Sequence, residues 1–156
     1  MKKKDVRLYN VIFPIWFMYL MLTPLWLLLL PINFAVDSLV IYCSASKQNI
    51  DNRKELWSKS IASVWGFGFL SDFLGAAVTF ILSLVLEAMP VVILPAFTRA
   101  TLISIPGLIL AGILIYLLNL KFSFKGSGLE SRQIRKLCLH LALWTAPYTM
   151  LIPFFL

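Results

Sequence analysis

The chain has 156 residues, of which 60% are apolar and only 13% are charged, and its formal net charge is +7. A soluble domain has about 45–50% apolar and about 25% charged residues, so a water-soluble globule of this composition would expose large apolar patches. These values exclude a disordered chain, a disulfide-stabilised scaffold and a soluble nucleic-acid-binding protein. They predict an all-α polytopic membrane protein, because the apolar runs lack the alternating pattern of membrane β-strands.

Four apolar blocks follow one another in a single integral membrane domain, residues 1–156. They cover about residues 8–43, 61–86, 100–120 and 137–156. A helix needs about 20 apolar residues to cross the bilayer, so the last three blocks predict three transmembrane helices. The first block contains Pro14, Pro24 and Pro31. It predicts a proline-broken hydrophobic hairpin, either re-entrant or made of two short spans, with its break between Thr23 and Asn33.

The basic residues indicate how the chain is oriented. All 14 lysines and arginines except Arg99 precede the first block or lie in the segments 44–60 and 121–136. If residues 8–43 double back, these residues share one side of the membrane, which the positive-inside rule assigns to the cytoplasm. A single kinked crossing of residues 8–43 would place the N-terminal basic cluster on the opposite side and remains the alternative. We expect a multi-pass protein of the bacterial inner membrane whose cytosolic loops contact anionic lipid headgroups.

The start of the last helix has a recognisable local pattern. Ser127 and Glu130 have the spacing of a capping box, in which each side chain bonds the backbone of the other residue. This spacing predicts a helix that begins near Leu129, before the chain enters the membrane.

Two aspartates lie inside the apolar blocks. Asp72 is near the middle of the second block, and Asp37 is nearer the cytosolic end of the first. Asn33 precedes Asp37 by four residues and therefore shares its helical face. An aspartate at the centre of a membrane helix costs about 2.5–3.5 kcal/mol on insertion scales, so each needs a partner, water or a neutral state. We interpret these residues as an ion or substrate site; the alternative is a set of polar contacts between helices.

Small and polar residues recur at helical spacing beside Asp72. Small side chains let another helix approach closely, and hydroxyls can bond across the contact. We expect helix packing at Gly68, Ser71, Gly75 and Thr79 in the second block, and at Gly107 and Ala111 in the third.

Three further polar residues lie near the ends of the blocks. His140 is the only histidine; it could relay protons at an ion site or bond a headgroup or a neighbouring side chain. Glu87 and Arg99 flank the connection between the second and third blocks and predict an interfacial ion pair. With one histidine and two separated cysteines, the chain lacks the ligands for a metal centre. No nucleotide or cofactor motif is present, so we expect no cofactor.

The sequence leaves two main hypotheses about function. The first is a transporter or channel-like subunit that uses intramembrane carboxylates. The second is a non-transporting accessory, assembly or immunity-type protein that docks a partner through its small-residue helix face. A lipid-modifying enzyme is a weaker third possibility, because the polar segments are too short for a catalytic domain. For either main hypothesis we expect a homo-oligomer or a complex with another membrane protein.

Overall fold

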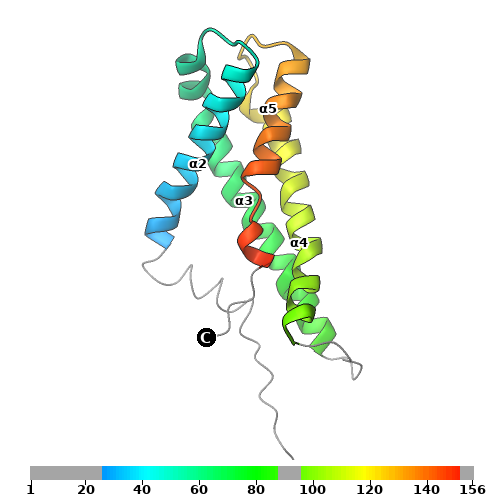
Figure 1. The fold of residues 1–156 in the computed structure, drawn as a ribbon. Coiled ribbons are helices and arrows are strands. Elements are labelled where there is room, and N and C mark those ends of the chain that lie inside the picture. The colour runs from blue at the N-terminus through cyan, green and yellow to red at the C-terminus, as the bar shows by residue number, and fades with distance from the viewer. Residues whose placement is uncertain (1–25, 88–95, 152–156) are drawn as a thin grey trace, which may run out of the picture.

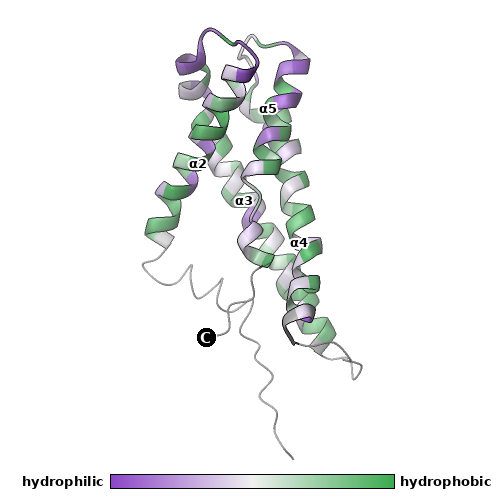
Figure 2. Cartoon of the chain, in the orientation of Figure 1, coloured by the Kyte–Doolittle hydropathy of each residue, from purple (hydrophilic) through white to green (hydrophobic). Residues whose placement is uncertain are grey.

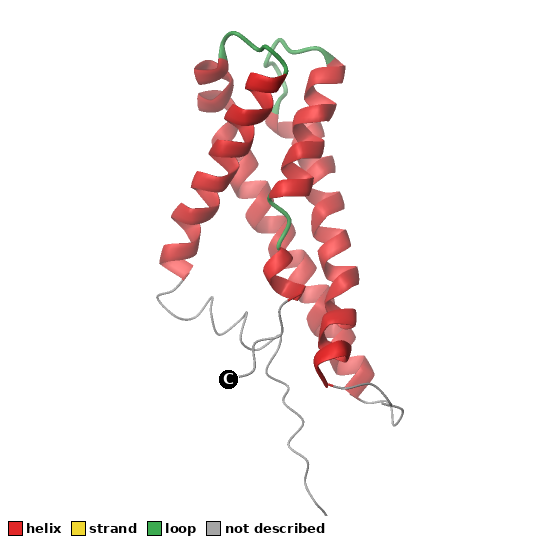
Figure 3. Ribbon diagram, viewed as in Figure 1, coloured by secondary structure: helices red, strands yellow, loops and turns green. Residues whose placement is uncertain are grey.

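The computed structural model describes residues 26–87 and 96–151, and the regular elements in these ranges are helices (Figure 3). The long elements are α2 (Trp26–Lys47), α3 (Arg53–Glu87), α4 (Ala96–Leu118) and α5 (Ser131–Trp144). A π-helix, η1 (Asn119–Ser123), extends α4, and a 3-10 turn, η2 (Tyr148–Leu151), follows α5. Within these two ranges, three helices are long and apolar enough to cross a membrane: Leu27–Lys47, Arg53–Leu86 and Thr98–Ser123.

The helices form a bundle in which α3 and α4 make the most extensive contact. Helix α2 packs against α3, helix α5 packs against α4, and α2 and α5 also pack against each other. The α2–α3 turn and the η1–α5 connection lie at the same end (Figure 1), where the hydrophilic residues also gather (Figure 2). The buried apolar core extends to this end and includes Ile50, Leu56 and Phe124. The two basic segments therefore share one end of the bundle.

The segment 44–60 between the first two apolar blocks is largely helical, and its cytosolic location stays a prediction. Helix α2 continues to Lys47 and α3 already begins at Arg53. Asn49 has a positive φ of 51°, and the Ile50 N–H donates to the Ala45 carbonyl at 3.0 Å, which closes the end of α2 in a tight turn. The block boundaries followed hydropathy, whereas a helix can extend beyond the apolar region.

The first apolar block is not broken at Pro31, although the sequence predicted a break in this region. Helix α2 begins at Trp26 and runs through Pro31, as membrane helices can when neighbouring groups satisfy the freed backbone. Its 22 residues span about 33 Å at 1.5 Å per residue, which is long enough for a full crossing. Residues 8–25, including the other predicted break at Thr23–Pro24, lie outside the described residues, so the hairpin remains a prediction.

The sequence predicted one transmembrane helix over the last apolar block, residues 137–156. That prediction is wrong, because the helix is not continuous over this block. Helix α5 ends at Trp144, because Pro147 has no N–H and disfavours a helical conformation at Ala146. The Leu143 carbonyl, four residues before Pro147, accepts a hydrogen bond from the Tyr148 hydroxyl at 2.6 Å instead. The chain therefore leaves the helix and, within the described residues, continues as the short turn η2.

The start of α5 also differs from the prediction. The helix begins at Ser131, and its capping box pairs Glu130 with Gln133 rather than Ser127 with Glu130. The Glu130 N–H donates to Gln133 Oε1 at 3.1 Å. The motif is three residues further along because a glutamate can take the N-cap position that serine normally fills.

The α3–α4 contact depends on two glycines. A Cβ added at Gly75 would lie 2.6 Å from the Gly107 carbonyl oxygen and 3.0 Å from Ala111 Cβ. A Cβ at Gly107 would collide with the Gly75 carbonyl oxygen and with Thr79 Oγ1. These four residues bring the two backbones into direct contact, which fixes the position of α3 in the bundle.

We therefore expect Gly75→Ala to lower the melting temperature of the detergent-solubilised protein. The added methyl group meets backbone on α4, and overpacking of this kind costs about 1–3 kcal/mol. Gly66→Ala is the matched control, because a Cβ at Gly66 has nothing within 4 Å and alanine favours helix over glycine. A Gly75→Ala protein that melts at or above the Gly66→Ala temperature would contradict this packing.

Candidate functional site

Asp37 is a buried carboxylate on the inner face of α2, with only 4% of its surface exposed. Its Oδ2 atom faces α3, where a Cβ added at Gly68 would lie 3.7 Å away. Gly68 thus leaves room for the carboxylate between the two helices. The position of Asp37 nearer the cytosolic end of its block stays a prediction, because burial within the chain does not measure depth in the membrane.

Asp72 projects from α3 one helical turn after Gly68. Its Oδ1 atom is buried and has no hydrogen-bond partner. Asp72 and Asp37 line the same cavity, from α3 and α2 respectively. Within the part of the chain that the structure describes, neither carboxylate has a hydrogen bond or an ion pair, and the ion pair found there joins Lys59 to Glu55.

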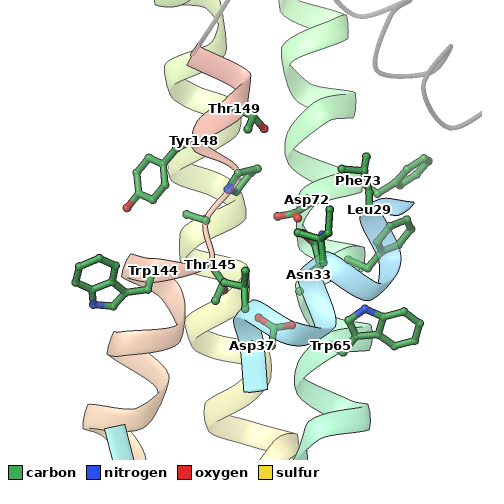
Figure 4. A pocket seen from close by; sticks show the side chains of 16 residues that line it. Leu29, Asn33, Asp37, Trp65, Asp72, Phe73, Trp144, Thr145, Tyr148 and Thr149 are labelled. Carbon is green, nitrogen blue, oxygen red and sulfur yellow. The ribbon is translucent and has the colours of Figure 1, made fainter. Parts of the chain in front are cut away.

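Both carboxylates line one cavity of about 370 Å³ between α2, α3 and the chain after α5 (Figure 4). Asn33 reaches the same cavity from α2, one turn before Asp37. The structure therefore brings together three residues that the sequence singled out for an ion or substrate site. Most of the remaining wall from α2 and α3 is apolar, with Leu29, Ile32, Val36, Trp65, Phe69 and Phe73.

The third wall is the irregular segment from Trp144 to Thr149. Non-helical backbone at membrane depth is tolerated only where it is buried in protein or lines a water-filled cavity. The Thr145 hydroxyl and N–H both donate to the Leu141 carbonyl, at 2.8 and 2.9 Å. Both donors of Thr145 are therefore used within the chain, and Thr145, Ala146 and Pro147 border the cavity that the two carboxylates line.

The sequence analysis did not identify this segment or Trp65 as part of the site. The available signal was Pro147 together with Thr145 and Thr149, which interrupt the last apolar block with polar side chains. Trp65 is recognisable only in three dimensions. Its indole N–H donates to the Leu30 carbonyl at 3.2 Å, which fixes the ring at the α2–α3 contact.

His140 lies apart from this cavity. Its Nδ1 atom is 2.6 Å from the Ser44 hydroxyl, which also accepts a longer hydrogen bond of 3.4 Å from Gln48 Nε2. The histidine therefore joins α5 to α2, which matches the alternative interpretation of a bond to a neighbouring side chain.

The other predicted residues occupy different places. Ser71 is fully buried and donates to the Phe67 carbonyl at 2.7 Å within α3. Glu87 ends α3, but its side chain lies outside the described part of the structure. The ion pair between Glu87 and Arg99 therefore remains a prediction.

We expect Asp37→Asn and Asp72→Asn to raise the melting temperature by a few degrees at mildly alkaline pH. An ionised carboxylate buried without a partner costs about 1–3 kcal/mol or more, and an amide of the same shape carries no charge. Glu55→Gln is the control, because Glu55 is exposed and paired with Lys59. If both asparagine variants melt below the wild type, the two carboxylates have structural partners.

Comparison of the chain with models of protein families, with curated proteins and with solved structures finds no match. A function can therefore be inferred only from the residues of this chain and the cavity they form.

Proposed function

We propose that this chain is a small transporter or channel-like subunit in which Asp72 and Asp37 bind a cation inside the membrane. One observation carries the proposal: two carboxylates from different helices line the same cavity, and neither has a partner among the described residues. Two carboxylates in one largely apolar cavity favour the binding of a positive charge.

A purely structural role for the aspartates has less support, because other buried polar residues of the chain behave differently. Thr79 donates to the Gly75 carbonyl at 3.1 Å, and Ser104 donates to the Ala100 carbonyl at 3.0 Å. Asn119 is fully buried and donates to the Ile115 carbonyl at 2.8 Å. These side chains satisfy their hydrogen-bonding groups within their own helices, whereas Asp72 leaves a buried oxygen unpaired.

The broken helix supports the same proposal. Ion and substrate sites of membrane transporters are commonly formed at discontinuous helices, where unwound backbone supplies polar groups at the bilayer midplane. Here residues Thr145–Pro147 form a non-helical segment between α5 and η2, and this segment borders the cavity. An intact helix at this place would present only side chains to the carboxylates.

The proposal includes an orientation in a bacterial inner membrane. The end of the bundle that carries the two basic segments lies in the cytoplasm, as the positive-inside rule requires, and contacts anionic lipid. Residues 8–43 double back, so that the N-terminal lysines share this side. The apolar faces of α2, α3 and α4 expose many large side chains, which contact lipid or a second copy in a homo-oligomer.

The docking hypothesis has less support from the contacts. Gly75, Thr79, Gly107 and Ala111 meet one another across α3 and α4 of the same chain. Gly68 faces Asp37 on α2. The small residues that were expected to receive a partner protein are thus occupied by helices of the chain itself, so transport remains the function that the geometry favours.

We expect the purified protein to move protons or another cation when it is reconstituted into liposomes under an imposed membrane potential. Asp72→Asn should abolish this flux while the variant stays folded, because an amide cannot supply the negative charge. Glu55→Gln, the same change at an exposed acid of the same helix, should keep the wild-type rate. Absence of flux in the wild type, or an unchanged rate in Asp72→Asn, would rule out the proposal.

A further inference from the structure

We propose that the substrate of this cavity is a lipophilic organic cation, an amine or a quaternary onium compound, rather than an inorganic metal ion. This inference rests on the proposed function and specifies its substrate class. It follows from the size of the cavity, from the apolar and aromatic character of its wall, and from the placement of Asp37, Asp72 and Trp65 around it (Figure 4).

The cavity is too large and too apolar for a bare inorganic ion. Its volume of about 370 Å³ falls in the range of sites for small organic ligands, roughly 300–1,000 Å³. Mg²⁺ and Ca²⁺ need about six or more oxygen ligands in close contact. The described residues contain no group of three acidic, histidine or cysteine side chains that could hold a metal. A small ion would lose its hydration here without enough oxygen atoms to replace the water.

An organic cation matches both parts of the wall. Its charged centre can contact Asp37, whose carboxylate is 4% exposed, has no partner among the described residues and lines the cavity. Its hydrocarbon groups can pack against Ile32, Phe69 and Phe73, which line the same space. Because the charge of such a molecule is spread over a weakly hydrated surface, its transfer from water costs less than that of a metal ion.

Trp65 adds a specific element of recognition. Its ring is held by the hydrogen bond to the Leu30 carbonyl at 3.2 Å and by an edge contact with Phe34, with 6.3 Å between the ring centroids. Aromatic rings attract organic ammonium groups through their π-electrons, and Trp65 is one of the residues that line the cavity. Trp65 and Trp144, two of the five tryptophans of the chain, line the cavity, so tryptophan fluorescence responds when it is occupied.

The test is a binding titration with tetraphenylphosphonium on the full chain in nanodiscs, followed by equilibrium dialysis and by tryptophan fluorescence. Triphenylphosphine oxide, which is neutral, and tetraphenylborate, which is an anion, are the matched probes. We expect saturable binding of the cation alone. We expect Asp37→Asn and Asp72→Asn to weaken it at least about tenfold, the loss typical when one member of a buried charge pair is removed.

A second pair of variants tests the cavity without changing any charge. Gly68→Leu directs a large side chain toward Asp37 and should abolish binding, because a Cβ at Gly68 already lies 3.7 Å from that carboxylate. Gly66→Leu has open space around its Cβ and should bind like the wild type. Thermal melting of each variant identifies any that fails to fold.

The outcomes separate this inference from the proposed function. Equal binding of the neutral probe, or unchanged binding in both asparagine variants and in Gly68→Leu, overturns the substrate class. If the wild type shows no saturable binding but still conducts protons or inorganic cations in liposomes, the inference fails and the proposed function stands. If neither binding nor flux is found, both fail.

Discussion

The structure depends on one constraint: in surroundings without water, every polar group needs a partner inside the chain. Most of the polar groups described above meet this requirement locally. The buried hydroxyls of Ser71 and Thr79 bond carbonyls of the preceding turn in α3. Where Pro147 leaves the Leu143 carbonyl without its usual helical donor, the Tyr148 hydroxyl takes that place. The fold can therefore include a broken helix and several polar side chains without leaving their groups unsatisfied.

Asp72 Oδ1 and the Ser127 hydroxyl are the buried side-chain atoms without a hydrogen-bond partner among the described residues. Asp72 and Asp37 both line a cavity that is bordered by the non-helical residues 145–147. The close approach of α3 and α4 at Gly75 and Gly107 fixes α3, and Asp72 is carried on it one turn before this contact. Across the cavity, α5 has ended and the chain is irregular. Helix α3, held by this contact, thus presents Asp72 to a cavity that residues 144–149 border on another side. This arrangement suits binding and release of a cation better than it suits packing.

Sequence reasoning predicted the helical membrane class and the three residues Asp72, Asp37 and Asn33 that meet at the cavity. Composition and the energetic cost of a charge in lipid are enough to predict these features, because both can be evaluated one residue at a time. It failed where a single residue competes with tertiary contacts. Helix α2 continues through Pro31, whereas α5 ends before Pro147, which has no N–H to donate and disfavours a helical conformation at Ala146. Such outcomes depend on neighbours that are distant in the sequence or on local geometry that hydropathy does not describe.

The most direct test of the account is an experimental structure of the chain in a lipid nanodisc, with density that places side chains around α2 and α3. The account predicts that both aspartates face one cavity and that no lysine or arginine of the whole chain pairs with either of them. A basic side chain paired with Asp37 or Asp72 would contradict it, because the charge assigned to a bound cation would then already be neutralised within the protein.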